Sequence, residues 1–440
     1  MTNSYRTLSR RDFITLSSAS SLALLTGCAT NPVTGRKMVD FIGESGEIAK
    51  DREAAPHQFS ADFGALQDAE LNAYITEVGR SVAGVSHRPN MPYSYRGVNA
   101  VYVNAYTFPG GSMAITRGML LRMESEAELA AVLGHEIGHV NARHTAQAMT
   151  RGVVTQVAAV GAAIALGKSD RDHALLALGL GGLGAGALLA RYSRDDEREA
   201  DSLGLDYLVK AGYTPQGMID LMDLLKQLGH SNASAVQLLF STHPMSEERF
   251  KTSVSKAENT YASAKTQRLD RERYMDRTTA LRARREAIET MQKGDEALAE
   301  GHANEGRTLL GQALKLAPDD YAGLLLMARH ELATKQFGEA QRYARQAQDV
   351  YPSEPQACYV NGMASISLRQ YDKAYESFHR YETLLPGNPN TIFFQGRSLE
   401  GMGRRDQAAD CYARYLKSGG EGDYARYARQ RLREWGYVKA

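Results

Sequence analysis

Two histidines and a glutamate stand at a spacing that suits metal chemistry. The segment His135-Glu136-Ile137-Gly138-His139 has its histidines four positions apart. On an α-helix, four residues at about 100° each bring both imidazoles to one face, one turn apart, so that they can reach the same metal ion. Glu136 would project beside them, where a carboxylate can take a proton from a water that attacks a carbonyl and later pass it to the leaving amine. The segment therefore predicts a catalytic metal site for hydrolysis.

A catalytic zinc site needs a third protein ligand. In the HExxHxxGxxH class that ligand follows closely, but here the deciding positions hold Ala142 and Thr145, so the class is excluded. His144 is off by one position and fits better as an outer or surface residue. The other solution is a carboxylate from a separate helix, and Glu197 and Asp201, one turn apart, are the candidates. The same residues also fit an exposed, charged helix start, and composition alone favours that interpretation.

Apolar residues on both sides of the histidine pair recur at helical spacing. A capping-box pattern at Ser125 opens an apolar repeat that runs through the motif. Upstream, residues 68–82 predict an amphipathic helix capped by Asp68, and residues 93–116 favour strands around a Pro-Gly-Gly turn. Pro109 cannot donate a ladder hydrogen bond, so its strand is expected at a sheet edge. That edge could hold an extended peptide, or it could be a plain structural hairpin.

The amino terminus carries the pattern of an export signal. Arg10-Arg11 precedes an apolar stretch, residues 14–25, that is too short for a mature membrane-spanning helix. The arginine pair resembles the twin-arginine export motif. The letters Leu-Thr-Gly-Cys that end at Cys28 look like a bacterial lipobox, so we expect residues 1–27 to be removed and Cys28 to carry a lipid. The alternative is a buried apolar helix with an incidental arginine pair.

Two further segments bear on a membrane. The polar residues 29–32 predict a flexible tether, and they lack the Asp that would argue against outer-membrane sorting. Residues 152–190 hold two runs rich in Ala, Gly, Leu and Val, each near the lower length limit for spanning a bilayer. We expect a helical hairpin that packs on the catalytic domain or enters the lipid interface, with a spanning hairpin as the alternative.

The last third of the chain repeats itself. Pro318, Pro352 and Pro386 recur every 34 residues, which is the period of tetratricopeptide repeats. Small residues keep the same step at the expected contact between paired helices, and Phe378 and Tyr412 fill the aromatic position of the later repeats. The small residues are Gly294, Ala328, Gly362 and Gly396. About four repeats follow, and such repeats stack into a solenoid with a groove for a peptide or protein.

Composition excludes several classes of protein. Among 440 residues, 52 Lys and Arg balance 51 Asp and Glu, so no charge excess points to nucleic acid. Three cysteines are too few for a disulfide framework, and we expect Cys358 and Cys411 to be core residues. The basic run in residues 265–286 fits a charged helical connector with a solvated face better than a contact with anionic lipid.

Several ordered motifs together resemble a known family. HEIGH on a helix, the pattern SRxxExxAD that contains Glu197, and Ser241-Thr242-His243-Pro244 are similar to the gluzincin peptidases related to HtpX and to CAAX-prenyl proteases. The likeness is strongest to the exported branch typified by the β-barrel assembly-enhancing proteases. It covers most of residues 31–250, including the segment Asn31-Pro32-Val33-Thr34-Gly35-Arg36.

This resemblance implies roles for the site residues. His135, His139 and Glu197 would bind one Zn²⁺ per chain, with Glu136 as general base and acid and Asp201 orienting a ligand. His243 and Arg249 would donate to the oxyanion of the tetrahedral intermediate. His243 could instead occupy the water position and silence the enzyme, or its segment could be only a turn.

The expected fold class is mainly α (α+β): a gluzincin metallopeptidase domain with a small β-sheet, followed by a tetratricopeptide-repeat α-solenoid. The expected divisions are an export signal at 1–27, the peptidase domain at 28–264, the connector at 265–286, the repeats at 287–422 and a capping helix or tail at 423–440.

The expected function is that of a lipid-anchored zinc endopeptidase on the periplasmic side of a bacterial membrane, expected to be the outer one. Unfolded or misassembled envelope proteins would be its substrates, and the repeat groove could also contact outer-membrane assembly machinery. The rival interpretation is a non-proteolytic chaperone or scaffold with a latent metal site. A processor of prenylated peptides is disfavoured, because the anchor and the export signal place the domain away from the cytoplasm.

Overall fold

A computed structural model describes residues 28–39, 42–148, 192–229, 234–420 and 422–438. The expected export signal, 1–27, and the apolar segment, 152–190, lie outside the described residues. Among the residues that are described, no helix combines the length and the apolar character needed to cross a bilayer.

A small sheet and two helices form the centre of the N-terminal half. The sheet has the order β3-β5-β4, with β3 (Ser94–Val98) parallel and β4 (Ala105–Thr107) antiparallel to β5 (Ser112–Thr116). Helix α3 (Ala69–Ala83) is capped by Asp68, whose side chain accepts a hydrogen bond from the Leu71 amide, as the sequence predicts. Pro109 lies in the turn after β4 and not within a strand, while β4 itself is at the edge of the sheet.

The histidine motif lies on α5 (Glu126–Asn141), and every residue of this helix is buried. A short helix, α4 (Arg117–Leu120), leads from the sheet toward it. Helix α5 packs against α3, against α9 (Arg194–Lys210) and against α10 (Gln216–Gly229). The metal motif is therefore placed at the middle of the domain and not at its surface.

Residues 28–39 form a hairpin and not a flexible tether. Strand β1 (Cys28–Thr30) pairs with β2 (Lys37–Val39) in antiparallel register. In the turn between them, the Asn31 side-chain oxygen accepts hydrogen bonds from the amides of Val33 and Thr34, and its Nδ2 donates to the carbonyl of Ala142 at 3.4 Å. This turn rests on the C-terminal end of α5, because Ala142 caps that helix. Helix α2 (Gly43–Ala61) follows.

Short helices connect the two halves of the chain. The connector is held against α4 and the turn after it: the Tyr274 hydroxyl donates to the Leu120 carbonyl at 2.6 Å, and Arg285 donates to the Leu121 carbonyl at 2.8 Å. Part of the charged connector therefore contacts the peptidase half instead of facing only solvent. The elements of this region are α11 (Ser234–Thr242), α12 (Glu247–Ser255), the π-helix η1 (Lys256–Thr260), the 3-10 helix η2 (Ala262–Ala264), α13 (Arg271–Arg277) and α14 (Thr279–Ala283).

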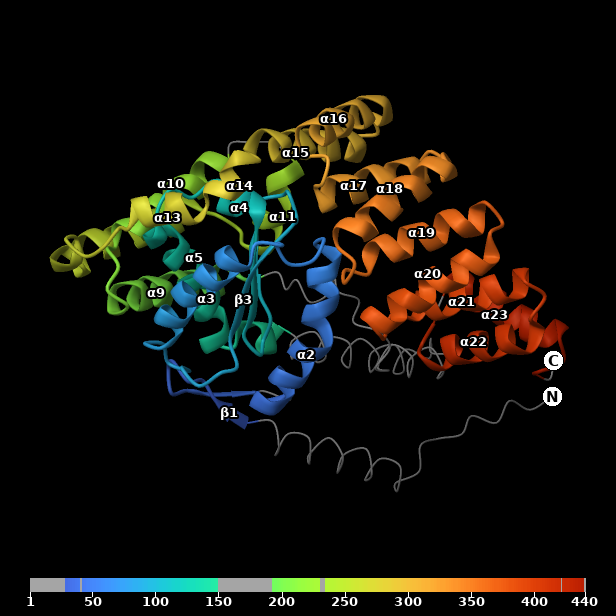
Figure 1. Cartoon of the computed structure of the whole chain (residues 1–440). Coiled ribbons are helices and arrows are strands. Elements are labelled where there is room, and N and C mark those ends of the chain that lie inside the picture. The colour runs from blue at the N-terminus through green and yellow to red at the C-terminus, as the bar shows by residue number, and fades with distance from the viewer. Residues whose placement is uncertain (1–27, 40–41, 149–191, 230–233, 421, 439–440) are drawn as a thin grey trace, which may run out of the picture.

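Paired helices form the C-terminal half, which curves around one side of α2 (Figure 1). In each of three pairs a glycine of the first helix meets a large side chain of the second: Gly294 faces Leu310, Gly362 faces Phe378 and Gly396 faces Tyr412. The helical solenoid is thus confirmed, with small residues at the positions that the repeat predicts. The helices are α15 (Arg285–Ala299), α16 (Ala303–Leu316), α17 (Tyr321–Ala333), α18 (Phe337–Val350), α19 (Gln356–Ser367), α20 (Tyr371–Leu384), α21 (Pro389–Gly401), α22 (Arg405–Lys417) and α23 (Gly422–Glu434).

The first repeat helices share one hydrophobic core with the peptidase half. Arg117 at the start of α4 and Asp320, which caps α17, form a buried two-point ion pair, with N···O distances of 2.6 and 3.0 Å. Near the end of α2, the Ser60 hydroxyl donates to Glu354 at 2.5 Å. The later repeat helices have a second core, which contains Phe378 and Tyr412.

Candidate metal centre

Capping residues determine where the two helices that carry the site begin. The Ser125 hydroxyl accepts the amide of Glu128 at the start of α5, and the Ser193 hydroxyl accepts the amide of Asp196 at the start of α9. The Asp196 carboxylate in turn accepts a hydrogen bond from the Ser193 amide, which completes a capping box. Glu197 therefore lies in the first turn of α9, one turn before Asp201.

The two helices cross closely because small residues face each other at the crossing. A Cβ atom at Gly134 would come 2.9 Å from the carbonyl oxygen of Gly204, and one at Gly204 would come 2.8 Å from the His135 amide nitrogen. Glycine at both positions removes these clashes and lets the backbones approach. The first two turns of α9 thereby reach the histidine motif.

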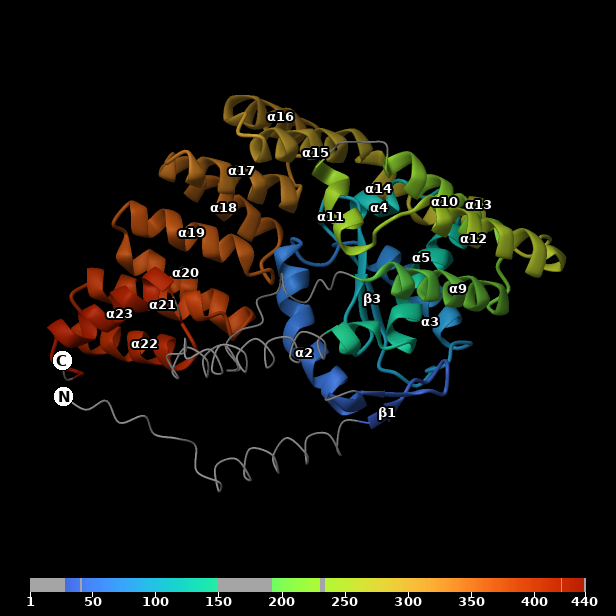
Figure 2. The same cartoon turned by 180° about the vertical axis from the view of Figure 1, so that it is seen from behind.

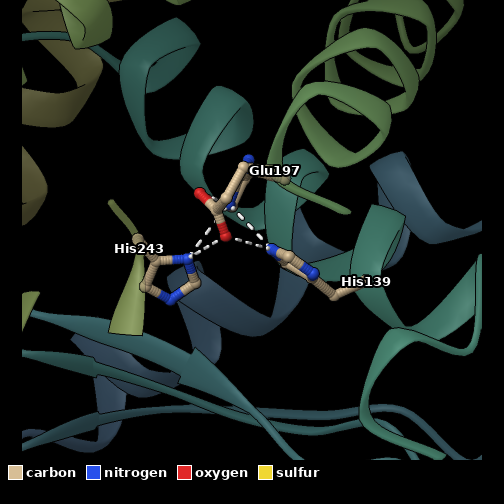
Figure 3. Close-up of side chains that lie close together, drawn as sticks. His139, Glu197 and His243 are labelled. Carbon is tan, nitrogen blue, oxygen red and sulfur yellow. Dashed lines mark hydrogen bonds and ion pairs between the residues drawn. The ribbon is translucent and has the colours of Figure 1, made fainter. Parts of the chain in front are cut away.

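Four side chains meet at this crossing and could hold a metal ion. His135, His139, Glu197 and His243 each offer one ligand atom, and the four atoms lie within 4.8 Å of one another. The Nε2 atoms of His135 and His139 are 3.0 Å apart. Figure 3 shows a Glu197 oxygen between two rings, with Oε1 3.3 Å from His139 Nε2 and 3.0 Å from His243 Nδ1. Glu197 is fully buried, so the exposed helix start that composition favoured is wrong for this residue.

Asp201 and Arg249 contact the ligand residues of the cluster and orient them. The His135 Nδ1 atom lies 2.9 Å from Asp201 Oδ1, so this nitrogen carries the proton and Nε2 points its lone pair into the cluster. The Arg249 guanidinium donates to both Asp201 oxygens at 2.8 Å and lies 2.6 Å from Glu197 Oε2. Arg249 is thus engaged with two carboxylates here, and its predicted contact with an oxyanion stays a prediction.

Burial sets the ionisation of these groups. Desolvation raises the pKa of Glu136 and holds the pKa of His139 well below its usual value. Desolvation also opposes the charge on Glu197, but His243 and His139 outweigh it and hold the Glu197 pKa well below the usual range. The result is an ionised carboxylate among imidazoles in a buried site, which suits a cation.

Glu136 stands beside the cluster without joining it. Its carboxylate is almost fully buried, and its Oε2 atom has no hydrogen-bond partner among the described residues. Its Oε1 atom is 3.8 Å from His243 Nε2. An unpartnered buried carboxylate oxygen is costly unless a ligand or water uses it, so this oxygen is available to a reacting water.

The donor set fits a zinc ion. Imidazole nitrogens and a carboxylate oxygen are zinc ligands, and the tautomer that Asp201 imposes on His135 is the one that metal-bound histidines show. Three of the four donors are the expected ligands, His135, His139 and Glu197. The fourth is His243, for which the resemblance implies either an oxyanion contact or a latency role.

Sequence reasoning missed two contributors and left a third undecided. The Tyr192 ring stacks on His139 with centroids 3.8 Å apart, and its hydroxyl lies 3.0 Å from Thr145 Oγ1. The glycines of the helix crossing were also not singled out. His144 is buried, with its Nδ1 2.9 Å from His139 Nδ1 and its Nε2 3.3 Å from Glu199. The only available signals were a tyrosine directly before the second motif and small residues four apart on α5.

Known proteins match parts of this chain. The family profile described as peptidase family M48 matches residues 69–256. Metalloprotease YcaL of Escherichia coli strain K12 is 30% identical over 243 residues, which cover 53% of this chain and 92% of that protein.

Other relatives are longer proteins. A putative beta-barrel assembly-enhancing protease of Vibrio cholerae serotype O1 is 30% identical over 195 residues, covering 44% of this chain and 40% of that protein. The beta-barrel assembly-enhancing protease of Escherichia coli strain K12 is 30% identical over 190 residues, and the chain spans 38% of its length. Among solved structures, a thermophilic TPR protein of Thermus thermophilus is 18% identical with a TM-score of 0.30, covering 34% of this chain and 83% of that one, which is too weak to carry a conclusion.

Proposed function

Because the chain belongs to peptidase family M48 and is a metalloendopeptidase, we propose that it uses zinc to cleave proteins of the bacterial envelope. The observation that carries the zinc proposal is the convergence of His135, His139 and Glu197 beside the unpartnered carboxylate of Glu136. Imidazole and carboxylate donors in a closed site favour zinc over the oxygen-seeking cations Mg²⁺ and Ca²⁺.

The residues around the cluster would share the work of hydrolysis. A zinc ion held by His135, His139 and Glu197 would supply Lewis-acid polarisation of the peptide carbonyl and make water a better nucleophile. Glu136 would accept the proton of the attacking water, since burial raises its pKa toward the working range, and would then protonate the leaving amine. His243 would donate to the developing oxyanion.

The position of His243 supports a resting state in which the enzyme is latent. Its Nδ1 atom lies among the ligand atoms, 3.3 Å from His135 Nε2. In that place it would be a fourth donor that leaves no position for water. Displacement of the loop after α11 would then open the site. The rival function, a chaperone or scaffold whose metal site stays closed, rests on this same observation.

The cellular setting of the proposal comes from the relatives and from the amino terminus. Two of the relatives are called beta-barrel assembly-enhancing proteases, so we propose misassembled outer-membrane proteins as substrates. Cys28 would carry a lipid on the periplasmic side of the outer membrane. The repeat helices would hold a client or a component of the assembly machinery.

The proposal is tested by Glu136→Gln, with Glu128→Gln as a matched control. Both changes remove a buried carboxylate from α5, but Glu128 lies at the start of the helix, where a glutamine oxygen can still accept the amide of Glu124. We expect Glu136→Gln to bind zinc as well as the unaltered chain and to lose cleavage of an unfolded protein. Glu128→Gln should keep both properties.

The same assay separates the two functions. Chelator-sensitive cleavage by the unaltered chain supports the peptidase. Client binding that is equal in the unaltered chain and in Glu136→Gln, without any cleavage, would support the scaffold instead. Full activity of Glu136→Gln would overturn the proposed mechanism.

A further inference from the structure

The amino-terminal hairpin leaves only a short length of chain between Cys28 and the peptidase core. Strand β1 starts at Cys28 itself, and three residues later the Asn31 side chain is hydrogen bonded to the end of α5. An extended chain spans at most about 3.5 Å per residue. A lipid on Cys28, which is part of the proposed function, would therefore hold the folded core close to the bilayer surface.

The end of the repeat array lies in the same lower half of the molecule as this hairpin in both views. In Figures 1 and 2, β1 lies at the lower edge, and the repeat array descends from α15 at the top to α22 and α23 in its lower part. A bilayer that approaches β1 from below would thus also approach the end of the array. Helices α4 and α13 lie in the upper half in both views.

One face of α23 is a stripe of arginines. Arg426, Arg429 and Arg433 are all exposed and recur at helical spacing, and they line one depression together with Gln430 and Glu434. The opposite face of α23 is used for packing, with Ala425, Ala428 and Leu432 buried. The stripe is therefore not needed to hold the helix in place.

Within the described residues, the stripe has little neutralising charge. Arg426 pairs with Asp423, but Arg429 and Arg433 have no ion pair there. Arg431, which does not belong to the stripe, instead pairs with Glu400 and Glu434. Two of the three stripe guanidinium groups are thus available to an anionic partner.

Aromatic side chains lie directly after α23 in the chain. Trp435 is the single tryptophan of the chain and is half-buried, with the guanidinium groups of Arg405 and Arg431 5.6 and 5.2 Å from its ring centroid. Tyr437 and Val438 are about half exposed. Tryptophan and tyrosine are enriched at the headgroup level of bilayers, where one end of the ring is apolar and the other is wet.

We propose that the arginine stripe of α23 docks on anionic phospholipid headgroups and seats the repeat array on the bilayer to which Cys28 would be anchored. Phosphate is a geometric match for guanidinium donors, which can bind it through two nitrogens. With both ends of the molecule on the surface, the array would have a fixed orientation toward membrane-bound clients.

Vesicle sedimentation tests this proposal on the chain from residue 28 onward, with Cys28→Ser so that no lipid can be attached. Vesicles of phosphatidylcholine with phosphatidylglycerol should bind the protein at low salt and release it at high salt, and vesicles of phosphatidylcholine alone should not bind it. Arg429→Gln/Arg433→Gln should weaken binding at least tenfold, because each basic residue near an anionic surface contributes about fivefold and the variant removes two of them.

A matched control carries Arg122→Gln/Arg277→Gln, which removes two exposed arginines next to α4 and in α13. We expect it to bind vesicles like the unaltered chain. Equal binding by the stripe variant and the control would overturn the proposal, as would the absence of vesicle binding. Capture by polyglutamate but not by vesicles would also overturn it, because the stripe would then be a site for an acidic protein. Peptidase activity without vesicles should be unchanged in both variants, so the result is independent of the zinc mechanism.

Discussion

Gly138 lies directly against the main chain of Ala200, where a Cβ atom would come 2.9 Å from the Ala200 carbonyl oxygen. One turn earlier on α5, Gly134 has the same relationship to Gly204. The helix that carries the two histidines and the helix that carries Glu197 are therefore in backbone contact. The width of this crossing decides whether Glu197 can reach the ligand cluster.

Gly138→Ala should weaken both the fold and the metal site. The added methyl group must push α9 away from α5, which typically costs about 1–3 kcal/mol when a core is overpacked. Because Glu197 and Asp201 move with α9, we expect zinc affinity to fall as well. Urea unfolding and competition with a chromophoric chelator measure the two effects.

Gly338→Ala is the control for this change. Gly338 lies in α18, where an added Cβ would meet nothing within 4 Å. Alanine is a better helix former than glycine by up to about 1 kcal/mol, so stability should be unchanged or slightly higher, with the same zinc affinity. Normal zinc affinity in Gly138→Ala would show that the close crossing does not set the metal site.

Asp201→Asn should reduce zinc affinity by about 10- to 100-fold, the range seen when a residue that orients a metal ligand is changed. Asparagine keeps the shape of the side chain but removes the charge that holds the His135 Nδ1 proton and the Arg249 guanidinium. Equilibrium dialysis against a buffered series of zinc concentrations gives the affinity.

Asp206→Asn is the matched control on the same helix. Its carboxylate contacts Lys256 and accepts the Tyr261 hydroxyl at 2.7 Å, away from the ligand cluster. It should affect stability at most and leave zinc affinity unchanged. If both variants bound zinc equally, the contact between Asp201 and His135 would have no part in metal binding.

The histidine motif was predictable because its chemistry lies within one turn of one helix. His135, His139 and the capping serine of α5 lie within one short segment, so their spacing can be recognised in a single sequence. Glu197 was a candidate because zinc needs a third ligand, but only the resemblance to a family favoured it over an exposed, charged helix start. Its burial results from the crossing of α5 and α9, which depends on contacts between segments far apart.

The repeat array was predictable for a different reason. A period of 34 residues repeats every contact several times, so positions such as Gly362 and Phe378 stand out even though they are 16 residues apart. The packing of the first repeats into one core with the peptidase half was not predictable. Arg117 and Asp320 carry no pattern in the sequence that would pair them, and a flexible tether at residues 29–32 was expected where the structure has a hairpin.

Asp320→Asn should destabilise the protein at neutral pH, and the destabilisation should begin to shrink below about pH 4. Burial would raise the Asp320 pKa, but Arg117 outweighs it and holds the pKa below the ordinary value of an aspartate. A carboxyl group with a depressed pKa stabilises the fold above about pH 4 and loses that contribution as the pH falls through its folded value. Asparagine can still cap α17 by accepting the Gly323 amide, so the variant isolates the charge.

The measurement compares urea midpoints of the variant and the unaltered chain between pH 7 and pH 3. At pH 7 we expect a loss of about 3–5 kcal/mol, because the variant leaves the buried Arg117 without its counter-ion. Asp319→Asn, next in sequence but exposed and paired with Arg284, should change little. A difference that stayed constant down to pH 3 would contradict the ion pair as its cause.

Gly362→Ala should disrupt the later repeats without touching the metal site. A Cβ atom at this position would come 2.7 Å from the Phe378 ring, which is fully buried in the second core. The ring packs against Tyr359 and Phe394, so overpacking should cost about 1–3 kcal/mol. We expect faster proteolysis after residue 362 with unchanged zinc content.

Gly311→Ala provides the contrast that makes this result specific to the helix-pair contact. Gly311 also lies in a repeat helix, α16, but its added Cβ would meet only the Met327 methyl at 3.9 Å, an ordinary contact. Because alanine favours the helix, this variant should resist proteolysis as well as the unaltered chain does or better. If both glycine variants were cleaved alike, the small residue of the 34-residue period would matter for backbone flexibility and not for the fit of paired helices.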